Sequence, residues 1–285
     1  MGYHTREPFV AVRILMTAND EKESPLRRPP LRQAGQSLQE QMDRVWDEKI
    51  DFYLLTALVV GALAFWDWWF WFFKIPRLPW ITTVIAIGYI AFAAIRLRPL
   101  YKRYCQLKLG RDGERTVGQE LEKLRAHGYR VYHDFLADGF NIDHIVIGPT
   151  GVFTINTKAV SKPKDPNAKI EYDGTRVTIP GTKLDRDPIA QAKAERDFIR
   201  KWIRENANRD APVRPAVVFV GWYTARRPEG AEVWVLNVSG LLSFIQNEHS
   251  ELSEDDIVHI CGILEAHILK KQRDLYDKLS PSWIN

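Results

Sequence analysis

Two long apolar stretches dominate the hydrophobic pattern of the first hundred residues. Residues 52–73 carry only Asp67 as a charge, and at about 1.5 Å per residue they span the roughly 30 Å hydrocarbon core of a bilayer. Residues 80–95 carry no charge. The pattern predicts a transmembrane helical hairpin over 51–95. The alternative is a hairpin buried in a soluble helical domain; a cleaved signal peptide is disfavoured because the apolar run begins far behind the start.

Helical and strand periodicities alternate after the hairpin. Val117, Leu121 and Leu124 recur at helical spacing before Gly128, and Glu114 shares their face, so its carboxylate points inward. Segments with strand periodicity follow this helix and alternate with further helical segments. The two kinds of pattern together predict a mixed α/β domain. The further predicted elements are strands over 129–135, 141–147 and 152–158, a hairpin over 169–179 turning at Asp173–Gly174, a helix from Asp187 to about Asn206, strands over 216–222 and 231–238, and a helix over 253–279.

The chain ahead of the hairpin is polar. The proline-rich basic stretch 24–33 predicts disorder over 1–36, and Ser37 with Glu40 predicts a capping box that opens a short helix. The resulting organisation is a polar N-terminal segment ending in a juxtamembrane helix (1–50), the hairpin (51–95), a basic juxtamembrane linker (96–111), the α/β domain (112–247) and a C-terminal helix (248–285).

Composition narrows the function only slightly. The 285 residues include 40 Lys and Arg against 36 Asp and Glu, a balance too mild to identify nucleic-acid binding. Cys105 and Cys261 lie far apart without a CxxC spacing, which argues against a disulfide framework or a zinc site. The Leu and Ile stripe of the last helix predicts core packing or contact with a second copy in a homo-oligomer.

The position of the basic residues is more informative than their number. Seven Lys and Arg flank the outer ends of the two apolar stretches, against Lys74 and Arg77 in the turn, which predicts two spans of the cell (inner or plasma) membrane with both termini cytoplasmic. The linker holds six basic residues and no acidic one, and we expect anionic lipid headgroups as its partner, with nucleic-acid phosphates as the alternative. These six are Arg96, Arg98, Lys102, Arg103, Lys108 and Arg111.

Three polar residues interrupt the apolar strands of residues 141–158. If the Gly-Pro-Thr-Gly turn closes as a four-residue loop, Asp143 faces Asn156, and Lys158 lies on the same sheet face. A three-residue loop with a bulge would instead bring Thr157 opposite Asp143. A carboxylate, an amide oxygen and an ammonium group near an inward carboxylate suit a hard divalent cation and phosphodiester cleavage. The structural alternative is a salt bridge between Asp143 and Lys158.

Three ordered motifs, "GRDGERTVGQELEKL", "NIDHIVIGPTGVFTINTK" and "DPIAQAKAERDFI", resemble the nuclease-related domain, NERD, a branch of the PD-(D/E)xK restriction-endonuclease-like superfamily. The resemblance covers roughly residues 110–240. It implies an α/β restriction-endonuclease-like core, in which helices flank a central mixed sheet, and a Mg²⁺ or Mn²⁺ site.

The roles of individual residues follow from this resemblance, with one departure. Asn156 stands where the superfamily has Asp or Glu, and an amide oxygen without negative charge should lower metal affinity. The implied metal ligands are Asp143, Asn156 and the main-chain carbonyl of Thr157; Lys158 is the implied catalytic lysine, Glu114 the helix carboxylate and Gln191 the polar residue that begins the following helix, where capping is its structural alternative.

The sequence therefore predicts a membrane-anchored, cytoplasm-facing nuclease-like protein that hydrolyses DNA or RNA with a divalent metal. The alternative, motivated by Asn156, is a catalytically inactive module that binds nucleic acid or a protein at the membrane. A purely structural membrane scaffold is the third option.

Overall fold

Residues 31–36 are folded, contrary to the disorder predicted for them from the sequence. The expected disorder over residues 1–30 lies outside the described residues, but residues 31–36 differ from the prediction because Arg32 is only 5% exposed. The computed structural model of the protein describes residues 31–75, 79–137, 139–163, 168–182, 184, 186–224, 228 and 230–279, with side chains as far as residue 275.

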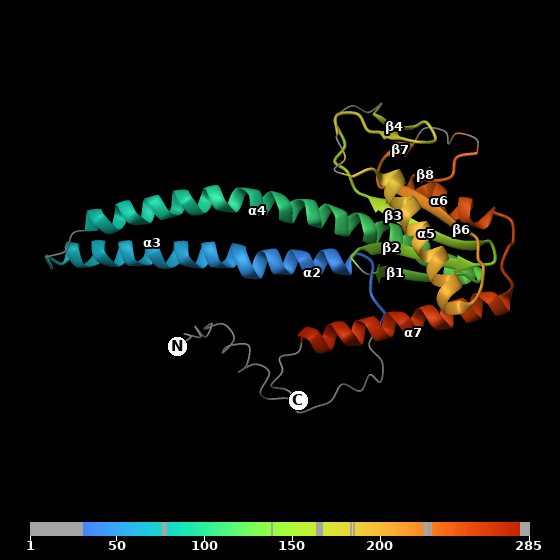
Figure 1. Ribbon diagram of the computed structural model, residues 1–285. Coiled ribbons are helices and arrows are strands. Elements are labelled where there is room, and N and C mark those ends of the chain that lie inside the picture. The colour runs from blue at the N-terminus through green and yellow to red at the C-terminus, as the bar shows by residue number, and fades with distance from the viewer. Residues whose placement is uncertain are drawn as a thin grey trace. The chain divides into compact units, whose positions relative to one another are not determined.

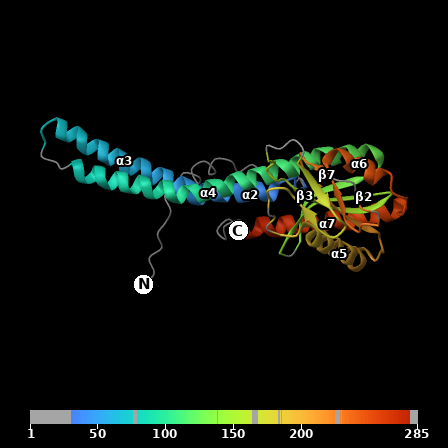
Figure 2. The same ribbon diagram turned by 90° about the horizontal axis from the view of Figure 1, so that it is seen from above.

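Two long helices carry the apolar stretches and lie side by side in both views (Figures 1 and 2). Helices α2 (Gln36–Val45) and α3 (Asp51–Phe72) are joined by a π-helical turn, and α4 (Pro79–Glu122) packs against both. The continuous helical segments Gln36–Phe72 and Pro79–His127 are each long and apolar enough to cross a membrane. Only 11% of the apolar window of each segment is buried. This exposure argues against the alternative of a hairpin buried in a soluble domain.

Helix α4 also unites segments that the sequence pattern separated. The basic residues 96–111 and the predicted helix after them belong to this one helix of 44 residues, which contains Pro99. A 3₁₀ turn over Lys123–His127 follows, and Gly128 ends it with φ 85°, as predicted for a glycine C-cap.

The predicted capping box of Ser37 and Glu40 is wrong. Gly35 caps helix α2 without a side-chain hydrogen bond, and the Ser37 hydroxyl donates instead to Asp134, 97 residues away. A buried carboxylate supplied by the tertiary fold has outcompeted the local partner.

The central sheet has the order β1-β2-β3-β6-β8. Strands β1, β2 and β3 are antiparallel, whereas β6 and β8 run parallel to β3. The register pairs Ile147 with Val152 across a short turn, which is the pairing expected for the four-residue loop. The strands are β1 (Arg130–Leu136), β2 (Asn141–Gly148), β3 (Gly151–Lys158), β6 (Val213–Phe219) and β8 (Trp234–Leu236).

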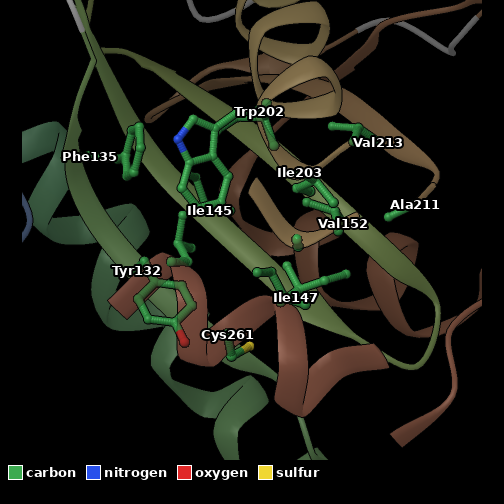
Figure 3. Packing of buried hydrophobic residues seen from close by; sticks show 14 of the residues in the cluster. Tyr132, Phe135, Ile145, Ile147, Val152, Trp202, Ile203, Ala211, Val213 and Cys261 are labelled. Carbon is green, nitrogen blue, oxygen red and sulfur yellow. The ribbon is translucent and has the colours of Figure 1, made fainter. Parts of the chain in front are cut away.

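Helices cover both faces of this sheet, as the predicted fold class requires. Helices α5 (Pro188–Ala207) and α7 (Glu254–Leu279) pack on one face through a cluster that includes Trp202, and Figure 3 shows part of this packing. The end of α4 and helix α6 (Val238–Gln246) pack on the other face. The apolar stripe of α7 is therefore core packing.

A second, smaller sheet has the order β5-β4-β7. Strands β4 (Lys169–Tyr172) and β5 (Val177–Thr178) form the predicted hairpin, and β7 (Tyr223–Thr224) pairs in parallel with β4. A third apolar cluster joins this sheet to α5 and to β6.

Candidate active site

Asp143 lies at the centre of the polar residues predicted from the sequence. Continuing the pairing of Ile147 with Val152 puts Asp143 opposite Asn156. The main-chain N–H of Thr157 donates to Asp143 Oδ2 at 2.7 Å. Desolvation raises the Asp143 pKa to about 6, although the Thr157 N–H and the charge of Lys158 act in the opposite direction.

Glu195, on helix α5, is the functional candidate that the sequence analysis missed. Asn156 Nδ2 donates to Glu195 Oε1 at 2.8 Å, and the Glu195 side chain is almost completely buried. A signal was present in the periodicity of this helix, because Ile189, Ala192, Glu195 and Ile199 recur on one buried face. A carboxylate in that stripe has to find a polar partner inside the protein.

Gln191 connects the predicted lysine to this additional carboxylate. Lys158 Nζ donates to Gln191 Oε1 at 2.9 Å, while Gln191 Nε2 donates to Glu195 Oε1 at 2.8 Å. The cap of α5 is Asp187, whose side chain accepts from the Ile189 N–H, so Gln191 does not serve as the cap. Among the contacts of the described residues, the alternative ion pair between Asp143 and Lys158 is not formed.

Glu114 approaches the same region from helix α4. Its pKa is raised to about 9, chiefly by desolvation and then by the negative charges of Asp143 and Asp134. The Gly35 N–H donates to the Glu114 carboxyl group and offsets part of this rise. Glu114 therefore carries a proton near pH 7 when no cation is bound.

The segment ahead of α2 forms a second buried polar cluster next to these carboxylates. Asp134, with φ 50°, lies opposite Asp143 in the continued β1–β2 register. Arg32 Nε donates to Asp134 Oδ2 at 2.8 Å, and the Ser37 hydroxyl donates to Asp134 Oδ1 at 2.6 Å. Asn141 Nδ2 donates to the Ser37 hydroxyl oxygen at 2.6 Å. Arg32 thus balances a negative charge that faces Asp143 and Glu114.

A chain of hydrogen bonds runs from the surface to Thr157. His133 Nε2 lies 2.8 Å from Glu122, the two Nδ1 atoms of His133 and His144 are 2.9 Å apart, and His144 Nε2 lies 3.3 Å from Thr157 Oγ1. With Glu122 as a carboxylate acceptor, these contacts fix the tautomer of each ring, and Thr157 donates to His144. Both histidines are packed side chains, and His144 is fully buried.

Two buried oxygen atoms in the site, Asn156 Oδ1 and Glu195 Oε2, have no hydrogen-bond partner among the described residues. Desolvation, followed by the charge of Asp143, raises the Glu195 pKa to about 8. Buried, undercompensated oxygen donors fit a hard divalent cation, which prefers oxygen ligands. Within the described residues no three His, Cys, Asp or Glu side chains form a ready metal cluster, so a ligand set here needs the Asn156 amide or a main-chain carbonyl.

The basic residues assigned to lipid or nucleic acid all lie on α4. Five of the six are exposed. Arg111 differs because its guanidinium group donates to Gln39 at 2.6 Å and pairs with Asp112 at 2.7 Å. It ties α4 to α2 and is not a freely solvated cation.

A mixed sheet whose central strands present Asp143, Asn156 and Lys158 to carboxylates on two helices defines a nuclease-like α/β domain. Residues 109–220 match the family described as the nuclease-related domain, so this part of the chain is a nuclease-related domain. An uncharacterized protein of Bacillus anthracis is 38% identical over 69 residues, which cover 22% of this chain and 32% of that protein. The chain thus spans about a third of this curated relative, and no solved structure matches it.

Proposed function

We propose that this protein is a membrane-attached nuclease that hydrolyses phosphodiester bonds of DNA or RNA with Mg²⁺ or Mn²⁺. The observation that carries the proposal is the contact between Asn156 and Glu195. Asn156 lacks the negative charge expected at its position, and Glu195 supplies a carboxylate to the same place from helix α5. The donor set thereby regains the charge that a divalent cation requires.

The residues divide into metal holders and groups that act on the phosphate. Asp143, Asn156 Oδ1, Glu195 and the Thr157 carbonyl would hold the cation. When bound, the cation supplies Lewis-acid polarisation of the phosphate and activation of the attacking water. Lys158, held in place by Gln191, would orient that water and stabilise the negative charge that develops on the phosphate.

The helical hairpin would place this site at the cytoplasmic surface of the cell membrane, with both termini in the cytoplasm. Helices α2 and α4 border a groove of about 380 Å³ lined by Arg44, Lys49 and Arg103, with Glu48 as its acidic member. Lys49 lies only three residues before Phe52, which begins the apolar stretch 52–73, and this position supports anionic lipid headgroups as the partner of this groove.

The second candidate function is nucleic-acid binding without cleavage. Asn156 favours it, because an amide in contact with a protonated Glu195 forms a stable metal-free site. Such a module would show salt-sensitive binding and no product. A structural scaffold would show neither binding nor cleavage.

The deciding experiment is a cleavage assay on the full chain in nanodiscs, because Arg32 and α2 are part of the folded unit. Labelled DNA and RNA are incubated with Mg²⁺, Mn²⁺ or EDTA. We expect metal-dependent cleavage that is lost in Lys158→Ala and in Glu195→Gln but kept in Lys201→Ala, a variant of an exposed lysine on α5. Cleavage unchanged in Lys158→Ala would refute the proposed mechanism, and binding without any product would establish the second function.

A further inference from the structure

The carboxyl ends of β3 and β6 lead into a distinct surface next to Lys158. Lys158 pairs with Phe219 across the two strands, and the Val220 N–H donates to the Lys158 carbonyl at 3.1 Å. The indole N–H of Trp222 donates to the Val160 carbonyl at 3.0 Å, which ties the two departing segments together. Trp222 is buried at 3% exposure and provides a firm base for the residue that follows it.

That following residue, Tyr223, presents an exposed aromatic ring with Lys162 beside it. Its side chain is 64% exposed. Lys162 Nζ lies 5.2 Å from the centroid of the Tyr223 ring and 5.8 Å from that of Trp222. Lys169, also exposed, is paired with Tyr223 in the register of β4 and β7. An exposed aromatic ring with one ammonium group beside it and a second lysine as its register partner combines stacking with attraction for phosphates.

We propose that Tyr223, together with Lys162 and Lys169, is a stacking site for an unpaired base of a single-stranded nucleic acid. The proposal rests on the proposed function and specifies the substrate class of the same site. Bases within a duplex are already stacked on their neighbours, so an isolated exposed ring takes up a base from a single strand or a frayed end. The two lysines then hold the phosphates on either side of that base.

The chain geometry keeps this surface within reach of the phosphodiester chemistry. Phe219 is the register partner of Lys158, and Tyr223 follows Phe219 by four residues. The Cα atoms of Phe219 and Tyr223 are therefore at most about 14 Å apart. A strand whose base stacks on Tyr223 can therefore present a phosphate a few nucleotides away to Lys158.

The test measures binding by the full chain in nanodiscs, with EDTA present to prevent turnover. Fluorescence anisotropy with a labelled single-stranded oligonucleotide gives the dissociation constant, and 2-aminopurine in the oligonucleotide reports stacking through fluorescence quenching. We expect Tyr223→Ala to weaken binding by roughly 5- to 150-fold and to abolish the quenching, because stacking on one aromatic side chain contributes about 1–3 kcal/mol per base.

The controls separate stacking from folding and charge. Tyr223→Phe keeps the ring and should bind like the wild type. Tyr101→Ala removes another exposed tyrosine, one on α4 with 61% exposure, and should also bind normally. Equal binding by Tyr223→Ala and wild type, or equal competition by a blunt duplex, would overturn the stacking site but leave the proposed function standing. A wild-type chain that binds neither DNA nor RNA would overturn both.

Discussion

The Asn156 side-chain amide donates a 2.8 Å hydrogen bond to the Glu195 carboxyl group, although the two residues are 39 positions apart. One strand and one helix therefore meet at the position where the sequence resemblance predicts a single acidic residue. The Asn156 amide stabilises the Glu195 carboxyl group by donating a hydrogen bond to it. A second carboxylate in the place of the amide would repel Glu195.

This contact predicts how the free energy of unfolding changes when the amide and the carboxyl group of Asn156 and Glu195 are exchanged. Asn156→Asp should lower the free energy of unfolding by about 1–3 kcal/mol without metal, because it brings two buried carboxyl groups into contact. The double variant Asn156→Asp/Glu195→Gln restores one amide and one carboxyl group, and should recover most of that loss. Chemical denaturation of the four chains in EDTA measures the coupling.

The same variants test the metal site. Mg²⁺ should raise the melting temperature of Asn156→Asp more than that of the wild type, since the added carboxylate increases the negative charge around the cation. Purely additive destabilisation in the double variant, together with no response to Mg²⁺ in any chain, would mean that Asn156 and Glu195 are not one ligand pair.

The raised pKa values predict the pH dependence of the metal-free chain. The pKa values of Glu195 and Glu114 rise from 4.5 to about 8 and about 9, so the folded state binds protons more tightly than the unfolded state. Their contribution to stability is complete below about pH 4.5 and is lost as the pH rises through 8 and 9. We expect the melting temperature in EDTA to fall over this window, more steeply than in Glu195→Gln.

Divalent cations should reverse part of that trend. Protons and a cation compete for the Glu195 carboxyl group, so Mg²⁺ should stabilise the wild-type chain more at pH 8.5 than at pH 6. A melting temperature that rises with pH in EDTA, or equal stabilisation by Mg²⁺ at both pH values, would contradict the assignment of Glu195 to a metal site.

The buried ion pair between Arg32 and Asp134 predicts a large cost for removing either partner. Both side chains are 3% exposed, and their closest atoms lie 2.7 Å apart. Arg32→Ala should reduce the free energy of unfolding by about 3–5 kcal/mol because Asp134 would remain as an uncompensated buried charge. The matched control is Lys123→Ala, which breaks an exposed pair with Glu120 of the same length and should cost less than about 1 kcal/mol. Equal costs for the two variants would show that the N-terminal segment is not docked as described.

Two glycines predict opposite effects of the same substitution. A Cβ atom at Gly148 would overlap the Tyr129 ring, so Gly148→Ala should destabilise the β2–β3 turn by about 1–3 kcal/mol. Gly262 lies in helix α7, and among the described residues no atom outside its own helical turn lies within 4 Å of an added Cβ atom, so Gly262→Ala should stabilise the chain by up to about 1 kcal/mol. Thermal melting of both variants provides the measurement, and shifts of the same sign would contradict the packing at Tyr129.

Local patterns in the sequence determined the elements that carry the site. The spacing of Val117, Leu121 and Leu124 defined a helix face, and all three side chains are fully buried. The turn between β2 and β3 fixed a register, and side chains two residues apart on a strand share a face, so Asp143, Asn156 and Lys158 could be grouped in advance. Asp187 and Pro188 placed the start of α5 correctly because a cap acts within one helical turn.

The tertiary structure alone decided which polar groups meet. Arg32 and Asp134 are 102 residues apart, and Asn156 and Glu195 are 39 apart, so no local period connects them. Ser37 and Glu40 match the local pattern of a capping box, yet the Ser37 hydroxyl donates its hydrogen bond to the buried carboxylate of Asp134. A hydrogen bond to a charged group in a buried, desolvated site is stronger than a hydrogen bond between neighbouring residues in water. The buried site forms only when the chain folds, so the local sequence does not reveal it.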